Sequence, residues 1–126
     1  MAGQGTCSGS CGGNAPLLVA SCSGRSNVGQ IANQVMVDID KAGAARSFCI
    51  AGIGAGLPGF LEGARTGKLI MIDGCPMQCG KKILDKYEVE PYRYFMVTEL
   101  GIKKEDTVGN LDPGVQKITS EVLGNI

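Results

Sequence analysis

Histidine and tryptophan are absent from this chain of 126 residues, and aromatic side chains are few. Without histidine, catalytic Cys–His and Ser–His pairs are excluded, and so are zinc sites that mix histidine with cysteine. Any zinc must therefore be held by sulfur, either alone or together with a carboxylate or water. The 12 basic and 12 acidic side chains cancel, and neither half of the chain is basic enough to indicate nucleic acid as the main partner.

Long apolar runs and a charged leader are also missing. No run approaches the ~20 apolar residues of a membrane span, so we expect no membrane partner. The first residues lack the charged region followed by an apolar region that marks a secretory signal. The length suits one domain with one core. We therefore expect a cytoplasmic protein.

Six cysteines are unusual in a cytoplasmic chain. In that compartment they serve metal binding or catalysis more often than structural disulfides. Cys7 and Cys11 fall in residues 1–14, a stretch rich in Gly, Ser and Cys that we expect to form a flexible tail before a domain over residues 15–126. Two interpretations of this pair stay open: additional metal ligands or a second thiol pair, and a solvent-exposed pair without a role.

Short apolar runs alternate with helical patterns along residues 15–126. Strands are expected at 17–20, 47–51, 69–72 and 92–97. Helices are expected at 28–42, 58–65, 75–86 and 112–123. Ser26 or Asn27 can cap the first of these helices. The alternation predicts an α/β fold, namely a single three-layer domain with a mainly parallel sheet of about four strands.

The segment 69–79 combines an apolar strand with two cysteines. Gly74 permits a sharp turn, and Pro76 suits the first position of a helix. With Cys75 at the helix entry, Cys75 and Cys79 would share one helix face, where the positive end of the helix dipole favours thiolates. The segment is typical of half a metal site or of a reactive dithiol.

Cys22, Cys49 and Cys75 follow one another at intervals of 27 (49−22) and 26 (75−49) residues, close to a strand–helix repeat of roughly 30. Each lies near the carboxyl end of an expected strand, the edge where α/β sheets bind ligands. With Cys79 they predict a zinc site of four thiolates, and Asp73 is placed to orient a ligand or to cap the turn. Cys49 is equally compatible with a buried core residue of its strand.

Two other motifs carry less weight. Cys22 opens a Gly/Ser loop, but the sixth residue after it is Val28, whereas low-molecular-weight phosphatases and arsenate reductases have an anion-binding Arg there. Arg25 stands at the wrong position, so ester hydrolysis is disfavoured. The segment 54–59 matches Gly-x-Gly-x-x-Gly, yet no acidic residue follows at the expected distance, which favours a plain glycine turn.

Several segments resemble the DGC domain family, small bacterial and archaeal proteins described as zinc-binding. The matching segments are 21–24, 28–32, 48–54, 72–76 with Cys79, and 100–104. They cover most of the chain after Pro16, and Asp-Gly-Cys-Pro is the most specific of them. The resemblance implies that Cys22, Cys49, Cys75 and Cys79 are the family's four cysteines, which hold zinc. It implies no reaction and no substrate.

Two functions remain open. The first is a zinc-binding module with its thiolates at the carboxyl edge of the sheet, acting in structure or in metal or thiol handling with a thiol-containing partner. The second is a redox enzyme of thiol, persulfide or metalloid chemistry, with Cys75 or Cys22 as nucleophile and Cys79, Cys7 or Cys11 as the resolving thiol. An iron–sulfur cluster on the same four sulfurs, and a rival metal set of Cys7 and Cys11 with Cys75 and Cys79, also remain open. The missing base and missing Arg favour metal binding.

Overall fold

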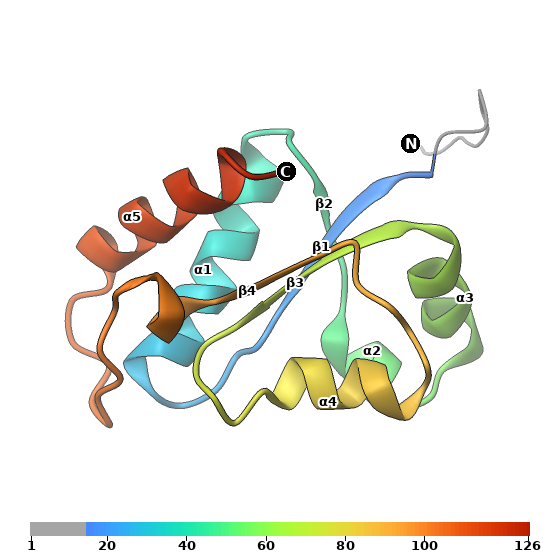
Figure 1. Ribbon diagram of the computed structural model, residues 1–126, viewed down its shortest axis with the longest axis horizontal. Helices are drawn as coiled ribbons and strands as arrows, with labels where there is room; N and C mark the ends of the chain where they lie inside the picture. The colour runs from blue at the N-terminus through green and yellow to red at the C-terminus, as the bar shows by residue number, and fades with distance from the viewer. Residues whose placement is uncertain (1–14) are drawn as a thin grey trace.

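A four-stranded, all-parallel sheet lies between two groups of helices (Figure 1). The computed structural model describes residues 15–126, so the expectations for residues 1–14 lie outside the described part of the chain. The strands are β1 (Leu17–Ser21), β2 (Arg46–Ser47), β3 (Lys68–Asp73) and β4 (Arg93–Met96), in the order β2-β1-β3-β4. The predicted α/β class is confirmed.

Helices cover both faces of the sheet. One face carries α1 (Asn27–Lys41) and α5 (Asp112–Leu123). The other carries α2 (Ile50–Gly54), α3 (Pro58–Thr66) and α4 (Cys79–Lys86). A 3₁₀ turn, η1 (Val97–Leu100), follows β4. Within residues 15–126, no helix combines the length and the apolar character needed to cross a membrane.

Strand β3 shows how the sequence produces these layers. Successive side chains of a strand point to opposite faces. Ile70 and Ile72 therefore pack with α1 and α5, whereas Leu69 and Met71 pack with the helices of the other face. Because both faces are covered, the strand is an almost continuous apolar run, as is usual for buried parallel strands.

The register of the sheet places the candidate cysteines at one edge. Ser21 pairs with Ile72 in the β1–β3 ladder. One residue further, the Cys22 backbone N–H donates to the Ile72 carbonyl at 2.9 Å. Strands β1 and β3 thus end at the same level, and the loops that carry Cys22 and Cys75 leave the same edge of the sheet.

The second predicted strand is present, but its predicted bounds of 47–51 are wrong. Strand β2 ends at Ser47, and the chain turns into the short helix α2. Cys49 occupies the N-cap position, where its sulfur accepts a hydrogen bond from the Gly52 N–H at 3.3 Å. Gly52 is buried, and a Cβ atom there would lie 2.7 Å from the Phe60 ring, so this helix packs closely on the α3 segment. Cys49 is therefore an exposed residue beside the sheet, not part of a buried strand.

The predicted start of α4 is also wrong. The helix begins at Cys79 rather than Cys75, and Gln78 before it adopts the left-handed conformation with φ 55°. Residues 75–78 form a turn in which the Gln78 N–H donates to the Cys75 carbonyl at 3.1 Å. Cys75 and Cys79 therefore do not share a helix face.

Candidate functional site

A pocket of about 260 Å³ opens at the carboxyl ends of β1 and β3. Three of the predicted cysteines line it, namely Cys22, Cys75 and Cys79. The other lining residues are Gly24, Arg25, Ser26, Gly29, Gly74, Met77, Lys104 and Asp106. They come from three loops: the β1–α1 loop with the start of α1, the β3–α4 loop, and the segment that precedes α5. Three of the four predicted cysteines thus line one pocket, and Cys49 is not among them.

Cys22 is a half-buried free thiol held by backbone donors. The Gly24 N–H donates to its sulfur at 3.3 Å, and the Gly74 N–H also donates to it. Burial raises the pKa of the Cys22 thiol above its ordinary value despite these two donors, and the nearby Asp73 and Cys79 add to the increase. The surroundings of Cys22 therefore favour its protonated form.

Cys75 and Cys79 are the other two cysteines that line the pocket. The Lys104 ammonium lies 3.6 Å from the Cys75 sulfur and donates to it. Cys79, the first residue of α4, is exposed. Met77, on the turn between these two cysteines, is 61% exposed and stands at the rim. Cys79 is thus more open to solvent-borne reagents than Cys22 and Cys75, which are both half-buried.

Cys49 lies elsewhere. It lines a second pocket, of about 360 Å³, together with Met36, Ser47, Phe48 and Phe60. Within residues 15–126, no group of three or more Cys, Asp or Glu side chains lies close enough to hold one metal ion. The structure therefore does not bring the four predicted cysteines together, and Cys7 and Cys11 fall outside the described residues.

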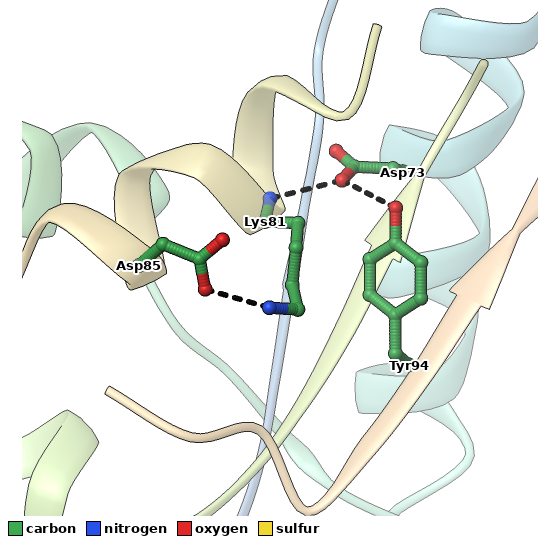
Figure 2. Close-up of polar contacts among 4 residues, drawn as sticks. All are labelled: Asp73, Lys81, Asp85 and Tyr94. Atoms are coloured by element: carbon green, nitrogen blue, oxygen red, sulfur yellow. Dashed lines mark hydrogen bonds and ion pairs between the residues drawn. The ribbon is translucent and has the colours of Figure 1, made fainter. Parts of the chain in front are cut away.

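Asp73 caps helix α4 from the end of β3. The carboxylate is 1% exposed and accepts hydrogen bonds from the Gly80 N–H at 2.9 Å and the Lys81 N–H at 3.0 Å. The Tyr94 hydroxyl donates to it at 2.8 Å, as Figure 2 shows beside the separate Lys81–Asp85 pair. Burial, together with this hydrogen bond and the charge of Asp73, raises the pKa of Tyr94. Asp73 thus fixes the start of the helix on which Cys79 lies.

Glycines let the cysteine loops pack backbone against backbone. A Cβ atom at Gly74 would lie 2.8 Å from the Gly29 nitrogen and 2.9 Å from the Val28 carbonyl carbon. One at Gly29 would lie 2.7 Å from the Gly24 nitrogen. Such distances are shorter than a real Cβ tolerates, so these positions need glycine. The loops that carry Cys22 and Cys75 are therefore both packed closely on the first turn of α1.

Sequence reasoning missed the third wall of the pocket, which Lys104 and Asp106 form. Asn27 holds this segment on the start of α1: its amide donates to the Lys103 carbonyl at 2.9 Å, and its carbonyl accepts from the Glu105 N–H at 2.6 Å. We expected Asn27 only as a helix cap, a role that Ser26 fills. The partners lie 76 and 78 residues away in sequence, so no local pattern signals the contact.

Comparison of the sequence with known proteins identifies the family of this chain. The chain is 43% identical over 88 residues to the anaerobic and virulence modulator AnvM of Pseudomonas aeruginosa, a match that covers 69% of this chain and 67% of that protein. No solved structure matches the chain. The profile of the DGC domain matches residues 18–122, the segment that contains the whole described pocket. The chain belongs to the DGC domain family.

Proposed function

We propose that this DGC protein binds a thiophilic metal ion, zinc, through Cys22, Cys75 and Cys79. The observation that carries the proposal is the gathering of these three sulfurs around one pocket at the carboxyl edge of the sheet. Thiolate is a preferred zinc ligand, and the chain offers no histidine to compete with it. The donor set thus fits zinc in its chemistry.

Local structure supports the same set. A cysteine side chain has one torsion with three staggered positions, so each sulfur can be re-aimed without moving the backbone. The Gly24 and Gly74 N–H groups that point at Cys22 are the kind of outer contact that supports a metal-bound thiolate. The contribution of Asp73 is indirect, because it fixes the start of α4 and, through it, the position of Cys79.

Among residues 15–126, three sulfurs at the pocket leave one tetrahedral position for a further ligand. Closed structural zinc sites use four protein ligands, whereas sites that keep a position open exchange water or substrate there. Cys49 lines a different pocket. We therefore propose a site that handles a metal or a thiol rather than a purely structural one. The name of the relative, an anaerobic and virulence modulator, favours a modulating role over a metabolic reaction.

Zinc titration of the reduced, metal-free chain tests the proposal, with a coloured chelator as competitor. We expect about one zinc per chain. Loss of an outer contact to a ligand weakens metal affinity roughly 10–100-fold, so Cys22→Ser, Cys75→Ser and Cys79→Ser should each weaken it by at least that factor. Cys49→Ser is the matched control and should bind as the parent does. If Cys49→Ser loses as much affinity as Cys22→Ser, the three-sulfur assignment fails.

A dithiol redox function is the second candidate. Exposure of Cys79 and the Lys104 ammonium beside Cys75 favour it, because accessible sulfur near a cation is typical of reactive thiols. Of the two predicted nucleophiles, Cys75 is favoured by its contact with the Lys104 ammonium, whereas Cys22 is half-buried and accepts a backbone hydrogen bond. This function requires a disulfide that forms and is reduced reversibly in the metal-free chain. A free-thiol count before and after mild oxidation distinguishes it from metal binding.

A further inference from the structure

Two cationic side chains line the cysteine pocket. Arg25 comes from the loop after β1, and Lys104 from the segment before α5. The ion pairs within residues 15–126 are Lys81–Asp85 and Lys103–Glu105, and neither cation of the pocket takes part in them. Asp106 is the carboxylate on the same wall. The charged groups of the pocket, Arg25, Lys104 and Asp106, therefore sum to a net positive charge beside three thiols.

The position of Lys104 is built into the fold. The side chain of Asn27 binds the Lys103 carbonyl on one side of Lys104 and the Glu105 N–H on the other. The backbone N–H of Asn27 adds a third hydrogen bond, to the Glu105 carbonyl at 3.2 Å. These contacts hold the intervening Lys104 on the start of α1, with its ammonium 3.6 Å from the Cys75 sulfur.

We propose that this pocket accepts a small sulfur compound that carries a negative charge, with its sulfur at Cys75 and its anionic group against Lys104 and Arg25. Pockets for drug-sized ligands span roughly 300–1,000 Å³, so a cavity of about 260 Å³ suits a smaller molecule. The inference rests on the proposed function, because it assigns a ligand class to the same three-cysteine pocket.

An anionic disulfide illustrates the chemistry. The Cys75 sulfur, after its proton passes to solvent, bonds to one sulfur of the disulfide. The original S–S bond breaks, and the other half leaves as a thiolate with the bonding electron pair. The small disulfide is reduced, Cys75 is oxidised to a mixed disulfide, and no further oxidant is needed. Lys104 and Arg25 attract the anionic reagent before the exchange.

Two methanethiosulfonate reagents of similar size test the charge preference in the metal-free full chain. The sulfonatoethyl reagent is anionic, and the trimethylammonioethyl reagent is cationic; each transfers its thioalkyl group to cysteine and releases methanesulfinate. Peptide mass spectrometry gives the rate at each cysteine, divided by the rate with a simple free thiol. We expect Cys75 to prefer the anionic reagent, and added salt to weaken that preference.

Charge-removing variants identify the cause. Lys104→Gln and Arg25→Gln should each lower the anionic preference at Cys75 by about three- to tenfold. Lys41→Gln, at the far end of α1, is the matched control and should change nothing. Cys49, in the second pocket, is an internal control whose preference should stay the same in the Lys104→Gln chain. Arg25 is exposed, so its variant remains informative even if Lys104→Gln folds poorly.

The two proposals fail separately. If Cys75 prefers the cationic reagent, or if both variants leave its preference unchanged, the ligand inference is overturned whatever the zinc titration shows. If the charge preference holds but the parent chain binds no zinc, the metal assignment falls and the pocket remains a receptor for anionic sulfur compounds.

Discussion

Gly74 illustrates how a single residue controls the site. A methyl group there would meet the Gly29 nitrogen and the Val28 carbonyl, and backbone atoms cannot turn aside as a flexible side chain does. We expect Gly74→Ala to lower the free energy of unfolding by about 1–3 kcal/mol, measured by urea denaturation.

The control for this substitution is Gly59→Ala, in helix α3. No atom lies within 4 Å of a Cβ built at Gly59, and alanine is favoured over glycine inside a helix by roughly 0.5–1 kcal/mol. Gly59→Ala should therefore be neutral or stabilising. Equal losses in the two variants would contradict the close packing of the Cys75 loop on α1.

Tyr94 connects the helix cap to β4. Tyr94→Phe removes one donor from the buried Asp73 carboxylate, which keeps the Gly80 and Lys81 N–H groups. Because the bond involves a charged acceptor but two donors remain, we expect a loss of about 1–2 kcal/mol in the free energy of unfolding. Urea denaturation near neutral pH measures it.

The raised pKa of Tyr94 also predicts a pH dependence. Since the folded pKa exceeds the unfolded value of about 10, the contribution of Tyr94 is fully present below that value and is lost as the pH rises toward the folded pKa. Stability should therefore decline on the alkaline side, and Tyr94→Phe should decline less steeply. Parallel stability curves for the two chains would exclude this role of Tyr94.

At the scale of elements, Asn27 joins helix α1 to the segment that carries Lys104. Asn27→Ala removes both side-chain hydrogen bonds, and each is worth roughly 1 kcal/mol. We expect the Glu105 amide to exchange its hydrogen about tenfold faster, as measured by hydrogen–deuterium exchange. Asn27→Asp keeps the acceptor for Glu105 but loses the donor to Lys103, so its exchange should be intermediate. An Asn27→Ala chain with unchanged exchange at Glu105 would show that the segment is held by other contacts.

The elements with strong local signals were predicted well. Strand β3 is a long apolar run, and α1 has a regular helical pattern, so both follow from residues that are close in sequence. The prediction of a strand over residues 48–51 was wrong because a short apolar run is compatible with a strand and with a buried helix equally. The contact of Gly52 with Phe60 and the capping of α4 by Asp73 are tertiary, and neither is visible within a short window of sequence.

For the candidate site, the sequence predicted the position of Cys22 and Cys75 but not that of Cys49 or Lys104. Regular strand–helix spacing brings Cys22 and Cys75 to one edge, because adjacent parallel strands end at the same level. The same spacing argument misplaced Cys49, because β2 ends at Ser47 and the chain leaves the sheet before Cys49. Lys104 carried no usable signal, because its approach depends on how a distant segment folds over the edge. Arg25 lies in the Cys22 loop, where the sequence indicated only that it is misplaced for a phosphatase motif.

At the scale of the whole molecule, the sheet separates two apolar clusters. Ile118 belongs to the cluster under α1 and α5, and Ile53 belongs to the one under α2, α3 and α4; both are fully buried. Ile118→Val and Ile53→Val should each cost about 0.5–1.5 kcal/mol. Because the two residues lie in separate clusters, the double variant should cost their sum within about 0.5 kcal/mol. A larger coupling, measured by urea denaturation of all four chains, would mean that the two faces respond as one core.

The pocket draws its walls from segments that are far apart along the chain. Lys104 is added 82 residues (104−22) after Cys22 during synthesis, and its pinning partner Asn27 emerges long before it. The loops that carry the cysteines are therefore synthesised before the segment with Lys104 that forms one wall of the pocket. Until that segment has been added and folded, the three sulfurs lack the Lys104 ammonium that lines the pocket, so its share of the charge preference cannot yet act on them.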